Sequence, residues 1–345
     1  MKISHFTHLH EFSAAEIMAL VDDAITLKKS APKGAPLAGK SLAFCFMNPS
    51  LRTQVSFAVA TNALGGHPVT LSLGAGGTWG MESVEGAVMD GAAAEHLKEA
   101  VPVLGRFCAA LGLRSFPAGA SWEEDKKEPQ LAAFRKYSTV PVINLESASG
   151  HPCQALADLM TIRERMDPKN KNFLLTWAPH VKALPMAVPN SAVEIAALAG
   201  MNVTIARPEG YDLDPEVMAR VNANCAAHGT ALRVTDDAPS AYDGQHVVYA
   251  KSWGSIANYG KPPSADPAFR AKWMVTAEKM RRARDAIFMH CLPVRRNVVV
   301  ADEVLDGPWS VVIDEAENRL HTAKAVLIKL LAAPKKTAAP RRQAP

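Results

Sequence analysis

The stretch SLAFCFMNPSLRT, residues 41–53, changes from an apolar run to a polar cluster within a few positions. Its first part, 41–47, has the length and apolar character of a strand buried on both faces, as in a parallel sheet. A helix is expected directly afterwards, over 53–65, ending at a Gly-Gly pair. A strand that leads straight into a helix is the building unit of parallel α/β sheets, and such sheets bind ligands beyond the carboxyl ends of their strands.

The same alternation continues on both sides of this stretch. Further strands are expected at 68–73, 111–116 and 141–146, with helices at 13–30 and 92–107. The pattern restarts near 171, with strands at 173–179, 201–208, 246–253, 286–293 and 310–314, and helices at 187–199, 214–228 and 276–282. The sequence therefore predicts an α/β protein with two doubly wound parallel-sheet domains, residues 1–150 and 151–316. Interdomain helices would join them, one starting near Pro152 and a last one over 317–332 that packs back on the first domain.

Composition limits the class of protein. The chain has 345 residues, 48 % of them hydrophobic and 21 % charged, which suits a globular protein with sizeable cores. Much of the net charge of +4 lies in the Pro- and Ala-rich basic tail 333–345, which is expected to be disordered. A nearly neutral body argues against nucleic-acid binding. We expect no membrane span and no signal peptide. The five cysteines are scattered and have no C-x-x-C spacing, so we also expect a cytoplasmic location and no bound metal.

Four polar clusters stand at the ends of predicted strands. They are the hydroxyl- and guanidinium-bearing 50–53, Arg114, the helix start 151–154, and 290–293 followed by two arginines. Free amide groups at a helix start, hydroxyls and an arginine together suit a phosphate group. Taken singly, each cluster has an ordinary explanation, such as a serine N-cap or a surface histidine. The glycines and lysine of a P-loop are absent.

Taken in this order, the clusters resemble the aspartate/ornithine carbamoyltransferase superfamily. Its S-x-R-T pattern matches residues 50–53, its H-P-x-Q matches 151–154, and the H-C-L-P of the ornithine-type branch matches 290–293. The resemblance covers the chain except its tail. It implies transfer of the carbamoyl group of carbamoyl phosphate to an amine, without a metal or organic cofactor.

The acceptor is suggested by 249–255, which reads YAKSWGS where free-ornithine enzymes carry a Ser-Met-Gly loop. A lysine here would repel a free α-ammonium group and attract a carboxylate. The resemblance is therefore to the branch acting on N-acylated L-ornithine, which gives N-acyl-L-citrulline in arginine biosynthesis.

The resemblance also implies roles for individual residues. Carbamoyl phosphate would be bound by Ser50, Leu51, Arg52, Thr53, Trp79, Arg114, His151, Pro152, Cys153, Gln154, Cys291, Leu292 and Arg319. Acylornithine would be bound by Ala94, Glu146, His180, Lys251, Leu292 and Arg295. Catalysis is assigned to Thr53, Arg114, His151 and Cys291. Trp79 would reach the site of a neighbouring subunit, which implies a homotrimer.

Two positions bear on the acyl group. N-acetyl-type enzymes typically carry a glutamate where this chain has Ala94, and can carry a lysine where it has Val299. A glutamate would repel the extra carboxylate of a succinyl group, so both departures favour N-succinyl-L-ornithine over N-acetyl-L-ornithine. Drift in an alanine-rich segment is the alternative explanation.

Two other classes of protein remain as alternatives. A non-catalytic carbamoyltransferase-like binding protein is disfavoured because the charge-stabilising residues are intact. A nucleotide-binding oxidoreductase is disfavoured because no G-x-G-x-x-G opens a helix after a strand.

Overall fold

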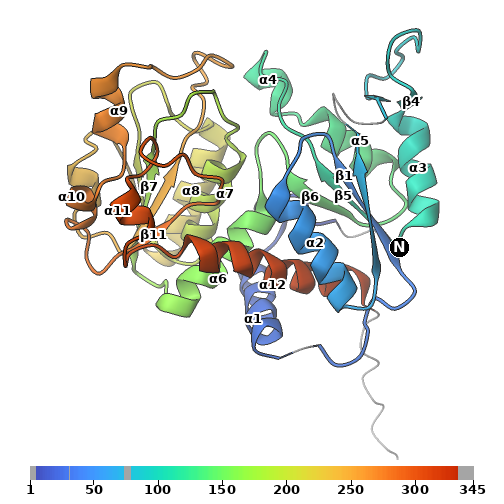
Figure 1. The fold of residues 1–345 in the computed structure, drawn as a ribbon, viewed down its shortest axis with the longest axis horizontal. Coiled ribbons are helices and arrows are strands. Elements are labelled where there is room, and N and C mark those ends of the chain that lie inside the picture. The colour runs from blue at the N-terminus through green and yellow to red at the C-terminus, as the bar shows by residue number, and fades with distance from the viewer. Residues whose placement is uncertain (1–4, 31, 74–78, 333–345) are drawn as a thin grey trace, which may run out of the picture.

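The computed structural model describes residues 5–30, 32–73 and 79–332, and contains two parallel sheets with helices packed on their faces (Figure 1). The first sheet has the order β2–β1–β5–β6, with strands β1 (Ser41–Phe46), β2 (His67–Ser72), β5 (Ala110–Arg114) and β6 (Val142–Glu146). The second has the order β11–β10–β7–β8–β9, with β7 (Asn172–Trp177), β8 (Asn202–Ala206), β9 (Leu232–Thr235), β10 (Val247–Lys251) and β11 (Ile287–Met289). The predicted doubly wound α/β fold is confirmed.

Helices cover both sheets. Around the first lie η1 (Leu9–Glu11), α1 (Ala14–Lys29), α2 (Leu51–Ala63), α3 (Leu97–Phe107), α4 (Trp122–Asp125) and α5 (Pro129–Tyr137). Around the second lie α7 (Ala187–Leu198), α8 (Pro215–His228), η2 (Ser240–Tyr242), α9 (Pro267–Trp273), α10 (Ala277–Met280) and α11 (Asp302–Leu305). A two-stranded ribbon of β3 (Met81–Glu82) and β4 (Glu95–His96) stands beside α3. None of the helices in these described ranges is long and apolar enough to cross a bilayer.

Strand order explains where polar groups gather. In the first sheet the chain leaves β1 in one direction to β2 and returns on its other side to β5, so the direction of winding reverses between β1 and β5. In the second sheet it reverses between β7 and β10. Such reversals open a crevice at the carboxyl ends of the strands. The predicted clusters lie at or just beyond the carboxyl ends of β1, β5, β6 and β11, at these crevices or next to them.

Two helices link the halves of the molecule. The buried helix α6 (Pro152–Arg165) leads from the first sheet to the second, and the final helix α12 (Val312–Leu331) packs against α6, α1 and α2. In Figure 1, α12 runs beneath both sheets. The predicted disordered tail, 333–345, falls outside the described residues.

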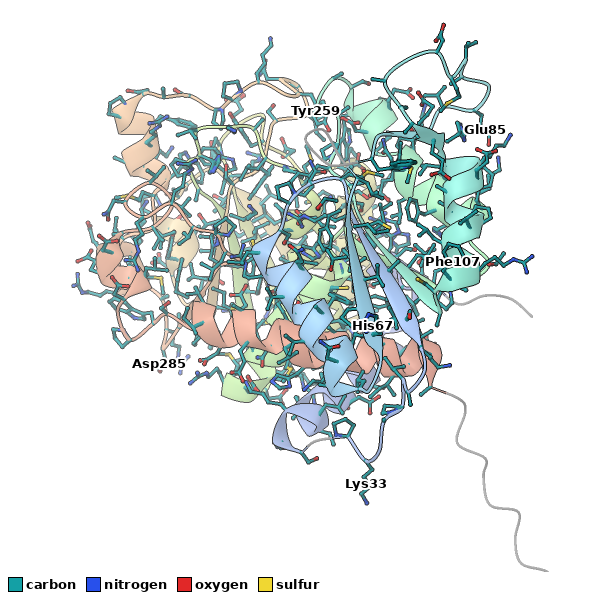
Figure 2. The ribbon with its side chains drawn as sticks, turned by 45° about the vertical axis from the view of Figure 1, so that its right-hand side comes forward. Lys33, His67, Glu85, Phe107, Tyr259 and Asp285 are labelled. Carbon is teal, nitrogen blue, oxygen red and sulfur yellow. The ribbon has the colours of Figure 1, made fainter. Side chains whose placement is uncertain are left out.

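A second connection between the halves lies on the opposite edge of the molecule, where Figure 2 labels Tyr259. The Tyr259 hydroxyl donates to Asp125 Oδ2 at 2.9 Å, and Trp122 Nε1 donates to Asp214 Oδ2 at 2.6 Å. The rings of Trp122 and Tyr259 are in contact, with centroids 5.7 Å apart. This contact, which we call the rim contact, fixes one half against the other at a point remote from α12.

Some predicted elements were wrong. The expected strand at 310–314 is the start of α12, and only Ser310 makes an isolated bridge, to Phe288. The β-branched run there suggested a strand, but Ile313 is 72 % exposed while Val312 is buried, as on one face of a helix. Tertiary packing therefore overrides local propensity. The helix expected at 92–107 begins only at Leu97, and that expected at 276–282 is shorter, Ala277–Met280.

Candidate active site

A cleft of about 540 Å³ collects side chains from all four clusters. The predicted site residues that line it are Ser50, Leu51, Arg52, Thr53, Arg114, Glu146, His151, Gln154, His180, Lys251, Cys291, Leu292, Arg295 and Arg319. Cations predominate among the described lining residues, and Glu146 is the one carboxylate among them. The cleft is therefore electrostatically suited to anionic ligands.

The start of α2 forms one wall. Ser50 is the N-cap, and its Oγ accepts a hydrogen bond of 3.3 Å from the Thr53 amide. The amide groups of the first turn lie at the positive end of the helix. Arg52 is half-buried, and burial lowers its pKa without removing its charge at neutral pH. This local structure can hold a phosphate group.

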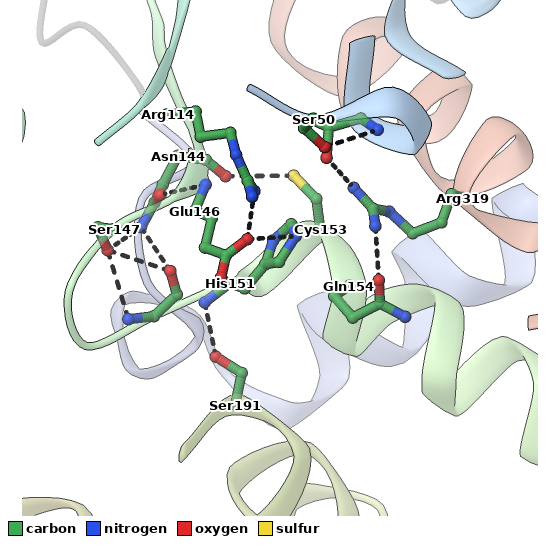
Figure 3. A network of polar contacts seen from close by, with 12 residues as sticks. Ser50, Arg114, Asn144, Glu146, Ser147, His151, Cys153, Gln154, Ser191 and Arg319 are labelled. Atoms are coloured by element: carbon green, nitrogen blue, oxygen red, sulfur yellow. Dashed lines mark hydrogen bonds and ion pairs between the residues drawn. The ribbon is translucent and has the colours of Figure 1, made fainter. Parts of the chain in front are cut away.

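Arg319 on α12 connects this wall to the linking helix. Its Nη2 donates to Thr53 Oγ1 at 2.8 Å, and its Nη1 donates to Gln154 Oε1 at 2.5 Å (Figure 3). Because the Thr53 hydroxyl accepts from Arg319, its own proton remains available to donate to a ligand. All three side chains are almost fully buried. Positions 53, 154 and 319 thus form one hydrogen-bonded unit.

Arg114, Glu146 and His151 form the centre of the network in Figure 3. Arg114 Nη1 is ion-paired with Glu146 Oε2, and His151 Nε2 lies 3.6 Å from the same oxygen. Burial, together with nearby Arg319 and Arg114, holds the pKa of His151 well below its usual value. His151 is therefore a neutral imidazole, and its contact with Glu146 is not an ion pair. Its main-chain amide is fixed by a 2.8 Å bond to Ser191 Oγ.

Three buried nitrogen atoms at the cleft have no hydrogen-bond partner among the described residues: Arg114 Nε, His151 Nδ1 and Arg319 Nε. Burying a polar atom without a partner costs about 1–3 kcal/mol. Their convergence in one place is typical of a binding site whose ligand supplies several acceptor oxygens.

The second half of the molecule contributes the opposite wall. Arg295 Nε donates to His180 Nε2 at 3.0 Å, and on the other side of the ring the Lys182 amide and carbonyl lie 3.1 and 3.2 Å from His180 Nδ1. Burial lowers the pKa of His180, and the Lys251 and Arg295 charges act in the same direction. Lys251 stands at the end of β10. This wall presents three cations, Lys182, Lys251 and Arg295, and a neutral imidazole.

The turn after β11 closes the cleft. Leu292 has φ 53°, in the left-handed region that bulky residues rarely adopt, and its amide donates to His290 Nδ1 at 2.9 Å. The Leu292–Pro293 peptide bond is cis. Burial raises the pKa of the Cys291 thiol to about 11, so it is not a thiolate at neutral pH.

Four predicted residues do not line this cleft. Pro152 and Cys153 form the buried first turn of α6 behind it, where burial raises the pKa of Cys153 to about 12. Trp79 and Ala94 lie in the segment around β3 and β4. There Trp79 Nε1 donates to Glu95 Oε2 at 2.9 Å, and the Ala94 amide donates to the Gly80 carbonyl at 3.0 Å.

Sequence reasoning missed lining residues that follow His180. They are Lys182, Leu184, Pro185 and Val188. Lys182, two positions after His180 in a loop beyond β7, was the available signal. Val299, used above to judge the acyl group, is a buried core residue of the second half and is absent from the lining of this cleft.

Comparison with known proteins agrees with this geometry. Residues 4–164 match the family model "Aspartate/ornithine carbamoyltransferase, carbamoyl-P binding domain", and residues 186–330 match "Aspartate/ornithine carbamoyltransferase, Asp/Orn binding domain". The chain is 42 % identical to N-acetylornithine carbamoyltransferase of Xanthomonas campestris pv. campestris, over 96 % of this chain and 98 % of that protein. It is 38 % identical to N-succinylornithine carbamoyltransferase of Bacteroides fragilis, over 92 % and 95 %.

Solved structures give the same result. A crystal structure of acetylornithine transcarbamylase complexed with acetylcitrulline superimposes with a TM-score of 0.89 at 41 % identity, covering 96 % of this chain and all of that one. Another, of a variant in which one glutamate is replaced by alanine, holds carbamyl phosphate and N-succinyl-L-norvaline and has a TM-score of 0.88 at 42 % identity, covering 95 % of this chain and 100 % of that one. The match in sequence and in fold along nearly the whole chain leads to one conclusion: this protein belongs to the aspartate/ornithine carbamoyltransferase family.

Proposed function

We propose that this carbamoyltransferase transfers the carbamoyl group of carbamoyl phosphate to the side-chain amine of an N-acylated L-ornithine, with N-succinyl-L-ornithine preferred. The products are N-acyl-L-citrulline and phosphate, a step of arginine biosynthesis. The observation that carries the proposal is the single cleft in which the α2 start, Arg114, His151 and Arg319 lie opposite Lys251 and Arg295.

Carbamoyl phosphate fits the first wall. Its phosphate would accept from the first-turn amides of α2 and from Arg52, a combination of helix dipole and guanidinium that favours a dianion. The unpartnered Nε atoms of Arg114 and Arg319 would gain acceptors from its oxygens.

The same groups would stabilise the transition state. As the amine attacks the carbonyl carbon, negative charge develops on the carbonyl oxygen, and Arg114, the Thr53 hydroxyl and the N–H of neutral His151 can donate to it. A donor that stays neutral avoids ionising the imidazole, a step that burial and neighbouring cations disfavour.

The acceptor amine has an ordinary pKa of about 10.4, so its deprotonation costs roughly 4 to 5 kcal/mol at neutral pH. Glu146 already forms an ion pair with Arg114 and is a poor base. The departing phosphate is the better proton acceptor. Main-chain carbonyls of the turn at Cys291 and Leu292 orient the amine, and the protonated thiol of Cys291 argues for direct transfer rather than a covalent intermediate.

The second wall would hold the acylated ornithine. Lys251 and Arg295 supply positive charge for carboxylates, and His180 is fixed by Arg295. An acceptor with a free α-ammonium would place a cation beside them. An acylated nitrogen removes that repulsion.

Ala94 supports the succinyl group, because its small uncharged side chain leaves space for a second carboxylate. The related glutamate-to-alanine variant bound to N-succinyl-L-norvaline is consistent with this argument. The higher identity to N-acetylornithine carbamoyltransferase, 42 % against 38 % for the N-succinyl enzyme, favours the acetyl acceptor as the second candidate.

A homotrimer with shared sites is part of the proposal. Trp79 and Ala94 lie outside their own cleft, so they would act only in the cleft of another subunit. On α2, at the edge of the cleft, Leu51, Val55 and Val59 form an exposed apolar stripe, with Leu51 74 % exposed. A second copy of the chain would cover this stripe and bring its own 79–96 segment to the cleft.

The test is citrulline formation from carbamoyl phosphate with N-succinyl-, N-acetyl- and free L-ornithine as acceptors. We expect turnover with acylated acceptors and preference for the succinyl one. Preference for acetyl would overturn the assignment from Ala94, activity only on free ornithine would overturn the role of Lys251, and no turnover would leave a binding protein. Sedimentation would test the trimer separately.

A further inference from the structure

Two buried carboxyl groups lie directly behind the cleft without lining it. Asp158 on α6 is 1 % exposed and Glu315 on α12 is fully buried. Gln154 Nε2 donates to both, at 2.8 Å to Asp158 Oδ1 and at 3.1 Å to Glu315 Oε1. One amide nitrogen thus holds the two carboxyls side by side, within hydrogen-bonding reach of each other.

Neighbouring carboxyls in a dry place do not both ionise, because each charge opposes the other. Burial raises the pKa of Asp158 to about 7, and burial together with Asp158 raises the pKa of Glu315 well above its usual value. Asp158 Oδ2 has no hydrogen-bond donor among the described residues. A proton held between the two carboxyls supplies one.

The surroundings favour one negative charge on the pair. Arg319 lies one helical turn after Glu315 and bonds to Gln154, so its cation faces the pair through the amide. The His290 amide donates to Glu315 Oε2 at 2.9 Å, and the Tyr249 hydroxyl lies 3.5 Å from Oε1. The charged and titratable groups that act on the pair are Arg319, Tyr249, Cys291 and, towards Glu315, Arg52.

We propose that Asp158 and Glu315 share one proton and act as a positioning pair that fixes the orientation of the Gln154 amide. On one side of this amide stand carboxyl acceptors and on the other the Arg319 donors, so its nitrogen faces the pair and its oxygen faces Arg319. The inference rests on the proposed function, because Gln154 lines the cleft and its oxygen is the acceptor offered to the carbamoyl amide. Glu315 also anchors the His290 amide, the start of the turn that carries Cys291.

Either carboxyl alone should be enough to hold the Gln154 amide. In Asp158→Asn the remaining Glu315 keeps one negative charge and the asparagine keeps an acceptor for Gln154. The reverse holds for Glu315→Gln. In the double variant no negative charge faces Arg319, and the substituted amides can donate as well as accept, so Arg319 alone still selects the orientation of the Gln154 amide.

We therefore expect each single variant to keep the KM for carbamoyl phosphate within about threefold, and the double variant to raise it by more than the product of the two single-variant factors, a non-additive result. Two independent structural roles would instead give additive losses. A single variant that loses as much as the double, or a double variant that matches the wild type, overturns the proposal.

Infrared spectroscopy tests proton sharing without substrate and without the double variant. One pH unit above the pKa of Asp158, about 7, the wild type should show the carbonyl stretch of a protonated carboxyl. The difference spectra against Asp158→Asn and against Glu315→Gln should each contain that band. Its absence from both overturns the proposal. A wild type that shows the band but does not consume carbamoyl phosphate overturns the proposed function and leaves proton sharing standing.

Discussion

Replacing Thr53 by valine removes one hydroxyl from the cleft and little else. Thr53 is 1 % exposed, and its Oγ1 accepts from Arg319 at 2.8 Å while its own proton remains available to the ligand. Loss of one donor to a developing oxyanion costs about 2.7–4 kcal/mol, or roughly 100- to 1,000-fold in turnover. The Arg319 Nη2 left without a partner should lower the free energy of unfolding by about 1–3 kcal/mol. Steady-state phosphate release and urea unfolding measure the two effects separately.

A matched control lies two turns along the same helix. Thr61 is fully buried, and its Oγ1 donates to the Phe57 carbonyl at 2.8 Å, with no contact to the cleft. Thr61→Val makes the same chemical change and should leave turnover within about threefold while lowering stability by about 1 kcal/mol. Thr53→Ser, which keeps the hydroxyl, should recover most activity. The reasoning is refuted if Thr53→Val stays within tenfold of the wild type, or if Thr61→Val loses turnover equally.

Three further outcomes follow from the structure. Arg52→Ala should abolish turnover and shift the urea midpoint little, because Arg52 faces the cleft, whereas the exposed Arg281→Ala should change neither. Although burial opposes it, hydrogen bonds from His8 and Ser149 lower the pKa of Glu128 to about 2. The stability that the Glu128 carboxylate contributes is complete above its unfolded-state pKa of about 4.3 and is lost as the pH falls towards 2. In an acid titration, the free energy of unfolding of Glu128→Gln should therefore fall less steeply than that of the wild type. Equal slopes would contradict this. Tyr259→Phe removes the hydrogen bond to Asp125 in the rim contact and should lower the free energy of unfolding by about 1 kcal/mol. Tyr211→Phe should not, because the Tyr211 hydroxyl makes no hydrogen bond within the described residues.

The elements that sequence reasoning located best were those with strong apolar patterns. The run 41–47 gave the first central strand because it is buried on both faces, and the polar residues after it could be assigned to a strand end. The start of α12 was harder to predict. Val311, Val312 and Ile313 have the composition of a strand, but the helix begins at Val312, whose side chain is buried while that of Ile313 is exposed.

Within the site, residue types were predictable but partnerships were not. The roles of Arg114 and Gln154 came from motif resemblance, while the pairing of Gln154 with Arg319 joins positions 165 residues apart. Asp158 had a weak signal, since it is a lone acid in the apolar stretch ALADLMTI. Its partner Glu315 lies in another helix, and no local pattern connects them. Neither could sequence indicate that Lys182 would reach the cleft.

The position of α12 has a consequence for biosynthesis. Arg319 contacts Thr53 across 266 residues of chain, so the cleft wall at the start of α2 is finished only when α12 has been made. A nascent chain still lacking α12 contains every strand of both sheets but holds neither Arg319 nor Glu315. We therefore expect binding competence to require synthesis of α12, and a chain truncated before α12 to be unable to capture carbamoyl phosphate.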